Sequence, residues 1–569
     1  MGLSLVAFDT DHIKEYVFGT DQLKEIRGAS SLLDYLNRNR MVDLARSLDL
    51  SFKEEQIIYA NGGSGLFLID SAKAVEFGTQ VQREYRRLTA GGASITYVVQ
   101  SLPAGAPDTL EDLEMIMTYP MPNTLALLRY RLREQKGHPH AYINEPSDPL
   151  MRLCDSCGIF YAVERVPIEA VYYCQSCLNK QVEDRVVKDY ITTWIGRQKP
   201  RKDFESPLWK EVLERLQRYN YYLPDDTERP EDLNVFGEFR QAKDYLGLIY
   251  ADANGMGKKF EEISTLREVQ DFAQKIDEAV YWAMCKVISD RLPVKELGKS
   301  WVFPFDILLI GGDDIVLVTP AAQAMPVAYA LAERFYTLTN GEQRQDSREQ
   351  AETHSLSVGV VLAPTNYPFS LMLNLVEDTL KFAKKDGSKE IEKEKSEYGK
   401  TRINFLVVSG NTSQSFRKVY KLLHQKDKKS QHSFYATMRS YTLERLKFLL
   451  EMLQEGSRLA LGRTKLHQLR EAILQLNLST SVTESLTVLR SWKEEERDFV
   501  VTKVYSTERK YPLYEWDEQN PAAHFPIVTF PWLVDSKEKD IKQYRTLLLD
   551  FVELYDFVAQ EDGDGYDKD

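Results

Sequence analysis

The chain has 569 residues, a formal net charge of −13 and 43% hydrophobic residues. This length exceeds that of one ordinary domain, so we expect three or four domains. The negative charge argues against a protein that binds nucleic acid over its whole surface. No run approaches 18 consecutive apolar residues and the N-terminus lacks a basic signal region, so we predict a cytoplasmic protein without a membrane span. Basic clusters at 129–136, 197–202 and 417–429 leave room for a local basic channel, although solvated faces are the simpler interpretation.

The first segment, residues 1–149, predicts a domain in which strands and helices alternate. It begins at 5–18 with an apolar strand that ends at Asp9 and leads into a helix. The later elements are a helical pattern, a hairpin around a Gly-Gly pair and a further strand, at 22–47, 57–70 and 94–100.

A cysteine-bearing insert follows at 150–185. Its two Cys-x2-Cys pairs are separated by sixteen residues and consist of Cys154, Cys157, Cys174 and Cys177. Four thiolates at this spacing are typical of a tetrahedral structural Zn²⁺ site, whose closed shell leaves no position for catalysis. We therefore predict a zinc knuckle. The fifth cysteine, Cys285, lies in a helical pattern and is predicted to be a core residue.

Residues 186–411 repeat the pattern of the first segment. An apolar strand that ends at Asp252 again leads into a helix, and further matching elements follow at 264–292, 307–320 and 354–364. The shared order is strand, helix, hairpin, helix, strand. It predicts an antiparallel-centred sheet with helices on one face, as in ferredoxin-like palm domains. The predicted fold class is thus α+β, with two palm domains.

The sharpest chemical signal is the turn Gly311-Gly312-Asp313-Asp314. Adjacent carboxylates at a hairpin tip repel each other, whereas Mg²⁺ (or Mn²⁺) binds through one or two carboxylates plus substrate phosphates. Asp252 ends the strand that we expect beside this hairpin and completes the set. Two metal ions held by these aspartates would activate a 3′-hydroxyl and stabilise a pyrophosphate leaving group. An ordinary Asp-rich turn is the alternative.

Two further segments are candidates for contacts with a triphosphate. The candidate residues are Asn254, Gly255, Met256, Gly257, Lys384 and Lys385. Glycines directly after a metal-binding aspartate let backbone N–H groups approach phosphates, although Asn-Gly is also a turn signal. The two lysines end a helical pattern, so they fit a phosphate contact and a favourable interaction with the helix dipole equally well.

The first repeat differs from the second in its turn, Asn61-Gly62-Gly63-Ser64-Gly65. In this alignment Ser64 and Gly65 stand where Asp313 and Asp314 stand, while Asp9 and Asp11 persist. We therefore predict a degenerate first palm that shapes the binding pocket without holding two metal ions. A purely architectural role is the alternative.

Beyond about residue 412 the strand signals stop and amphipathic helical patterns appear, for example at 435–453 and 464–476. We expect a C-terminal helical domain over 412–569. Its last residues, 560–569, are acidic and are predicted to be disordered.

This combination of motifs resembles the large polymerase-like subunit of type III CRISPR effector complexes. The resemblance covers nearly the whole chain and includes the segment KEIRGASSLL at 24–33. It implies that the second palm polymerises ATP into cyclic oligoadenylates when the complex meets target RNA. The implied partners are ATP, guide and target RNA and other effector subunits. Asp252, Asp313 and Asp314 would be the metal ligands, and Ala383-Lys384-x-x-Gly387 is similar to a motif of GGDEF cyclases, which favours Lys384 as a triphosphate contact.

Many members of this family begin with a His-Asp nuclease domain. None of the eight histidines of this chain is followed by Asp, so we expect no DNase activity from it. The identity of the product and the dependence on a guide-RNA complex stay open. Two other hypotheses also stay open: a diguanylate-type cyclase that uses GTP, and a scaffold subunit that binds ATP without catalysis.

Overall fold

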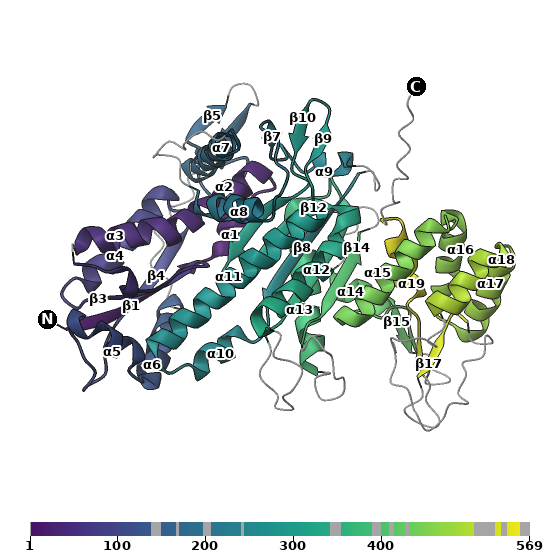
Figure 1. Ribbon diagram of the computed structural model, residues 1–569. Helices are drawn as coiled ribbons and strands as arrows, with labels where there is room; N and C mark the ends of the chain where they lie inside the picture. Colours follow the sequence, from purple (N-terminus) through teal and green to yellow (C-terminus); the bar gives the residue numbers. More distant parts are fainter. Residues whose placement is uncertain are drawn as a thin grey trace.

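The computed structural model describes residues 2–49, 51–137, 150–166, 170–196, 206–239, 244–341, 354–389, 400–408, 415–426, 432–505, 530–535 and 543–557. The first palm (purple), the second palm (teal) and the C-terminal helices (green to yellow) follow one another across the molecule in Figure 1. In the described part, no helix has the length and apolar character needed to cross a membrane.

The first palm is a four-stranded sheet with the strand order β2-β3-β1-β4. All its strand pairs are antiparallel, and β1 lies in the centre because it pairs with both β3 and β4. Its elements are β1 (Leu3–Asp11), α1 (Ile13–Phe18), α2 (Leu23–Tyr35), α3 (Met41–Leu48), β2 (Ile57–Asn61), β3 (Ser64–Asp70), α4 (Ala74–Leu88), β4 (Ser94–Ser101), α5 (Leu113–Thr118) and α6 (Pro122–Gly137).

The second palm repeats this topology in the order β11-β12-β8-β13 and adds a parallel edge strand, β14, beside β13. Its elements are β8 (Tyr245–Ala253), α10 (Met256–Glu262), α11 (Leu266–Arg291), β11 (Asp306–Gly311), β12 (Asp314–Pro320), α12 (Ala321–Asn340), β13 (Leu356–Pro364), α13 (Phe369–Lys389) and β14 (Ile403–Val407). The structure therefore confirms the predicted repeat of strand, helix, hairpin, helix and strand.

The strand register corrects the alignment of the two hairpin turns by one residue. Asp9 pairs with Ser64 across the first sheet, and Asp252 pairs with Asp314 across the second. Ser64 is therefore equivalent to Asp314, and Gly63 is equivalent to Asp313. The prediction that Ser64 and Gly65 occupy the positions of Asp313 and Asp314 is wrong, because the first turn carries its glycines one residue later relative to the strands.

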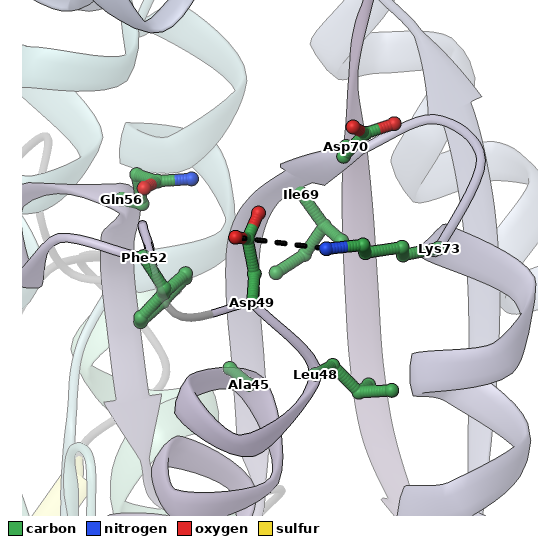
Figure 2. A pocket seen from close by; sticks show the side chains of 8 residues that line it. All are labelled: Ala45, Leu48, Asp49, Phe52, Gln56, Ile69, Asp70 and Lys73. Atoms are coloured by element: carbon green, nitrogen blue, oxygen red, sulfur yellow. Dashed lines mark ion pairs between the residues drawn. The ribbon is translucent and has the colours of Figure 1, made fainter.

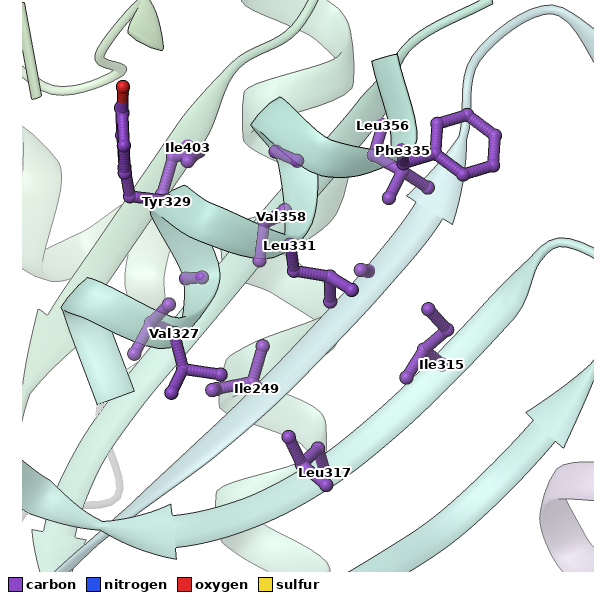
Figure 3. Packing of buried hydrophobic residues seen from close by; sticks show 14 of the residues in the cluster. Ile249, Ile315, Leu317, Val327, Tyr329, Leu331, Phe335, Leu356, Val358 and Ile403 are labelled. Carbon is purple, nitrogen blue, oxygen red and sulfur yellow. The ribbon is translucent and has the colours of Figure 1, made fainter. Parts of the chain in front are cut away.

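Helices cover both faces of the second sheet, not one face as predicted. Successive residues of a strand point to opposite faces, and here both sets are apolar. Ile249, Ile315 and Val358 pack with α12, as Figure 3 shows, whereas Leu248 and Val361 belong to the cluster that contains the buried residues of α13. The strand sequences are therefore continuous apolar runs. The alternation of side chains along a strand does not reveal from such a run whether helices cover one face of the sheet or both.

The cysteine insert is attached to the first palm through a long helix. Its strands β5 (Glu164–Val166) and β6 (Val171–Tyr173) precede α7 (Gln175–Ile195), which packs along α2. The two helices approach closely at Gly28: a Cβ atom added there would lie 1.8 Å from the carbonyl oxygen of Lys180. Any larger residue at Gly28 would force α2 and α7 apart.

The remaining linker elements lie between the insert and the second palm or within that palm's segment. They are α8 (Pro207–Arg218), β7 (Thr227–Glu228), α9 (Val235–Glu238), β9 (Lys295–Leu297) and β10 (Ser300–Val302), of which the three strands form a small sheet in the order β7-β10-β9.

The C-terminal segment contains the predicted helices and, in addition, a small sheet. Its strands β15 (His424–Lys426), β16 (Ser433–Tyr435), β17 (Leu533–Asp535) and β18 (Gln543–Arg545) have the order β15-β16-β18-β17. The expectation that strands stop at about residue 412 is therefore wrong, because three-residue strands are too short to show a pattern. The helices are α14 (Phe416–Leu422), α15 (Leu443–Arg458), α16 (Arg463–Ile473), α17 (Leu478–Arg490), α18 (Glu494–Asp498) and α19 (Leu548–Tyr555).

The first helix expected in this segment begins later than predicted. α15 starts at Leu443 because the Thr442 side chain accepts a hydrogen bond from Arg445 N, whereas Tyr435 ends β16. The acidic tail at 560–569 and the basic cluster at 197–202 lie outside the described residues.

Candidate active site

Two of the three predicted catalytic carboxylates lie side by side at one end of the second sheet. Asp252 is the penultimate residue of β8, Asp314 is the first residue of β12, and the two are direct partners in the antiparallel register. Asp313 precedes Asp314 in the turn, which Gly312 closes with φ +61°. The hairpin thus brings Asp313 and Asp314 to the strand end that carries Asp252, as the sequence predicts.

The carboxylates of this turn carry negative charge that the protein does not fully neutralise. Burial raises the pKa of Asp313 to about 6, and the charge of Asp252 adds to this shift. The pKa of Asp314 rises to about 7, again through burial first and then through the charges of Asp252 and Asp313. Neighbouring carboxylates of this kind are suited to bind a divalent cation, because hard carboxylate oxygens are the ligands that Mg²⁺ prefers.

The three aspartates are not gathered into a compact metal cage. Among the described residues, only the four cysteines of the insert form a set of three or more candidate ligand atoms that all lie within 4.8 Å of one another. An open arrangement of this kind is what Mg²⁺ sites that share their ligands with substrate phosphates require, since the protein then supplies only part of the coordination shell.

Lys384 is the cation nearest to this group. It lies on α13, and its ammonium group forms an ion pair with the Asp252 carboxylate. The Lys384 side chain is 32% exposed, so it has room to turn toward a bound phosphate. Lys385 follows on the same helix and is exposed.

The structure gives Asn254 a different role from the predicted phosphate contact. Its side-chain amide donates to Ser355 Oγ at 3.0 Å, and its carbonyl oxygen accepts from Ser357 Oγ at 2.8 Å. The side chain therefore ties the end of β8 to β13. Gly255 and Gly257 remain suited to close approach by a ligand, because a Cβ atom at either position would meet open space. Met256 is buried beneath them.

The same tie exists in the first palm, at equivalent positions. Asp11 accepts hydrogen bonds from Ser94 Oγ at 2.9 Å and from Thr96 Oγ1 at 3.0 Å. The register makes Asp11 the counterpart of Asn254, and it makes Ser94 and Thr96 the counterparts of two serines of β13. Asp11 is therefore a structural residue of this palm and not a remnant of a metal ligand.

A lysine neutralises the carboxylates of the first palm. Lys136 Nζ lies 2.7 Å from Asp9 Oδ2 and 3.9 Å from Asp11 Oδ1, and it donates to the carbonyl oxygen of Thr10 at 3.0 Å. This lysine belongs to α6, which follows β4 as α13 follows β13. Lys136 and Lys384 thus contact equivalent aspartates, but three oxygen atoms surround the first ammonium group.

The two hairpin turns touch each other at the boundary between the palms. A Cβ atom at Gly62 would lie 2.6 Å from Gly312 N, and one at Gly311 would lie 3.1 Å from Gly62 Cα. Only glycine permits this approach of two backbones. The aspartates therefore lie next to the first palm, and the candidate site is bounded by both palms.

The four cysteines of the insert form the second candidate metal site. Their sulfur atoms all lie within 4.8 Å of one another, and three of the four residues are buried. Cys177 N donates to Cys174 Sγ at 3.4 Å, and hydrogen bonding from Cys157 raises the pKa of Cys174 to about 12. Thiols this close cannot all ionise without a cation between them, so the set fits Zn²⁺ as predicted.

The depression drawn in Figure 2 belongs to neither candidate site. It lies in the first palm, where α3 and the start of α4 meet the far end of β3, and an ion pair of 3.6 Å between Lys73 and Asp49 closes it. Asp70 and Ile69 line it at the end of β3 opposite the Ser64 turn. Nothing in its lining suggests chemistry.

Comparison with known proteins places the second palm in a described family. Residues 245–391 match the family model of the Cas10/Cmr2 second palm domain. The second palm is Cas10-like. The matched segment contains Asp252, the Gly311–Asp314 turn and Lys384. No curated protein matches the sequence.

Solved structures extend the likeness to most of the chain at the level of the fold. A chain of the Csm1–Csm4 cassette in complex with pppApApA is 13% identical, with a TM-score of 0.51, and the match covers 90% of this chain and 68% of that one. The cassette with AMPPNP is 12% identical, with a TM-score of 0.49 and coverages of 87% and 65%. The present chain therefore spans less than two thirds of the length of the latter relative.

Several residues near the carboxylates were not found by sequence reasoning. Tyr250 lies two residues before Asp252, burial and then the charge of Asp314 raise the pKa of its hydroxyl, and Lys14 of the first palm lies over its ring. Glu377 of α13 pairs with Lys14. Tyr250 carries a periodicity signal, since it shares a face with Asp252. Lys14 carries none, because its contacts cross from one palm to the other.

Proposed function

We propose that this chain is a metal-dependent nucleotidyltransferase that polymerises ATP into cyclic oligoadenylates. The observation that carries the proposal is the direct pairing of Asp252 with Asp314, next to a turn that holds Asp313. Three carboxylates at one strand end, with raised pKa values in two of them, form a partial ligand set for divalent cations. Mg²⁺ or Mn²⁺ would supply the Lewis acidity that activates a 3′-hydroxyl.

The residues of the chain have separate tasks in this reaction. Asp252, Asp313 and Asp314 hold the cations, and ionisation of the two buried carboxyls prepares the site for them. Lys384, which pairs with Asp252, is placed to contact the triphosphate of the incoming nucleotide. Gly255 and Gly257 leave space for phosphates at the start of α10.

The proposed substrate and partners rest on the relatives. One solved structure with a similar fold is a Csm1–Csm4 cassette in complex with pppApApA. We propose that the present chain likewise uses ATP and works with further subunits of a type III CRISPR complex, together with guide and target RNA. The four-cysteine knuckle holds structural Zn²⁺ in this proposal and takes no part in the reaction.

The proposal is tested by incubating the purified protein with each radiolabelled NTP and Mg²⁺, with and without guide and target RNA. We expect adenylate products from ATP, and we expect none after Asp313→Ala and Asp314→Ala are combined. Asp271→Asn is the matched control, because Asp271 is an exposed residue of α11 that lies outside the site.

Each alternative hypothesis has its own outcome in this experiment. A strong preference for GTP would support the diguanylate-type cyclase. If the wild-type protein bound ATP but made no product from any NTP in the presence of activating RNA, the scaffold hypothesis would replace the proposal. Product formation that survives the double substitution would show that the site lies elsewhere.

A further inference from the structure

A short helix of the first palm contacts the helix of the second palm that carries Lys384. Three residues of α1 and the turn after it make these contacts, and we call them the α13 clamp: Lys14, Phe18 and Asp21. Lys14 Nζ lies 3.0 Å from Glu377 Oε1, the Phe18 ring lies 6.0 Å from the Phe369 ring, and Asp21 Oδ1 accepts from Ser370 N at 2.8 Å. The clamp therefore contacts α13 at its first residues and again two turns later.

The clamp and the candidate site share one face of α13. Glu377 and Lys384 are seven residues apart, which is about two helical turns, so their side chains point in the same direction. The first pairs with Lys14 and the second with Asp252. A shift of α13 that breaks the contact at Glu377 would also move the ammonium group of Lys384 away from the carboxylates.

Lys14 is itself close to the catalytic strand. Its ammonium group lies 4.9 Å from the centre of the ring of Tyr250, a residue of β8 two positions before Asp252. Favourable cation–π contacts have this geometry. The Lys14 side chain is 44% exposed, so it has little part in the core.

Glu377 also pairs with Lys381 at 3.1 Å, but Lys381 lies on α13 itself and cannot tie that helix to another element. Lys14 lies five residues after Asp9, and the residue five after Asp252 is Gly257, which has no side chain. The first palm has Gly63-Ser64 in place of an Asp-Asp turn, yet it supplies a cation at a position where the second palm has a glycine.

From these contacts we infer that Lys14 is a positioning residue for the second palm's reaction. It holds Glu377, and thereby holds α13 with Lys384 over Asp252. This inference rests on the proposed function and deepens it, since it makes the second palm's activity depend on a side chain of the degenerate palm.

A double-mutant cycle in the full chain tests how Lys14 acts. We expect Lys14→Met to lower kcat/KM for ATP by about five- to tenfold, as a helix displaced by a fraction of an ångström would. Combined with Lys384→Met, it should add no further loss, because both substitutions remove the same interaction. Lys275→Met on α11 is the control, because Lys275 is exposed and lies outside the site. Losses that multiply in the double variant would overturn the inference, since Lys14 would then contact the nucleotide independently.

Charge reversal gives a second, independent readout. Lys14→Glu places two carboxylates together and should reduce kcat/KM more than Lys14→Met. Because Glu377 also pairs with Lys381, the exchange is made in a Lys381→Met background, where Lys14→Glu combined with Glu377→Lys should restore kcat/KM to within about threefold of that background. A merely structural role of Lys14 would not predict this rescue. An exchanged pair as inactive as the single variant would contradict the inference.

Amide hydrogen exchange separates failure of this inference from failure of the proposed function. If Lys14 holds α13, Lys14→Met should speed exchange at residues 370–384 by about tenfold, whether or not the protein makes a product. Unchanged exchange there would overturn the inference even in an active enzyme. Absence of product from the wild-type protein would instead overturn only the proposed function.

Discussion

Removal of one candidate catalytic carboxylate should make the metal-free protein more stable. The pKa of Asp314 rises from 3.8 to about 7 in the folded state, chiefly through burial. Each pKa unit corresponds to about 1.4 kcal/mol, so ionisation of Asp314 at pH 8 costs the fold at most about 4 kcal/mol. Because Asp252 and Asp313 share this repulsion and water reaches the turn, we expect Asp314→Asn to recover about half of it, or about 2 kcal/mol.

The assay is thermal unfolding of the full chain with EDTA and then with Mg²⁺. A gain of about 2 kcal/mol corresponds to an increase of about 4–8 °C in the melting temperature of a cooperative unit of palm size. The folded-state pKa is raised, so the cost is absent below about pH 4 and complete above about pH 7. The gain should therefore be largest at pH 8 and about a third of that at pH 5.

Mg²⁺ should reduce or reverse the difference in melting temperature between Asp314→Asn and the wild-type protein. It should stabilise wild type, whose carboxylates it neutralises, and it should stabilise Asp314→Asn much less. Asp271→Asn removes one negative charge from the exposed face of α11 and should change neither response. A variant that is less stable than wild type at pH 8 without metal would refute the electrostatic reasoning.

Three further predictions concern Lys384, the contact between the two hairpin turns, and the four-cysteine insert. Lys384→Met should lower kcat/KM for ATP by about ten- to a hundredfold in steady-state assays, because a charge-assisted contact with phosphate is lost. Gly62→Ala should lower the free energy of unfolding by about 2–4 kcal/mol in denaturant titrations, whereas Gly91→Ala, also at positive φ but with open space around it, should cost about 1 kcal/mol. Cys177→Ser should abolish binding of about one zinc ion per chain, measured by elemental analysis, and should lower the melting temperature.

The topology of both palms was predictable from the sequence because the repeat is carried by local patterns. An apolar strand that ends in aspartate and a Gly-Gly hairpin each depend on a few consecutive residues, and the structure confirms their order in both halves. The position of Asp252 opposite Asp314 follows from the same order. The register of the first turn was not predictable in this way. The two hairpins can be aligned by matching their Gly-Gly pairs or by matching their paired strands, and only the observed strand pairing decides between these alignments.

Contacts between the palms had no local signal in the sequence. Lys14 meets Glu377, and Gly62 meets Gly312, through packing of two domains that are distant in the chain. Asn254 shows a related limit. Its place after a metal-binding aspartate suggested a phosphate contact, yet two hydroxyl groups of the neighbouring strand bond its side chain. Those serines lie about a hundred residues away, so local reasoning could not find them.

The balance of charge at equivalent positions explains why only one palm is expected to bind metal. In the first palm, Asp9 and Asp11 share Lys136 and two hydroxyl donors, so the protein itself satisfies both carboxylates. In the second palm, Lys384 pairs with Asp252, and the charges of Lys14 and Lys384 only partly offset the effect of burial on Asp314. Burial first, and then the neighbouring carboxylates, raise the pKa values of Asp313 and Asp314, and a divalent cation would stabilise their ionised forms. The first turn has Gly63-Ser64 where the second has Asp313-Asp314, so it lacks the carboxylates that would need a cation, while its strand pairing is equivalent to that of the second palm.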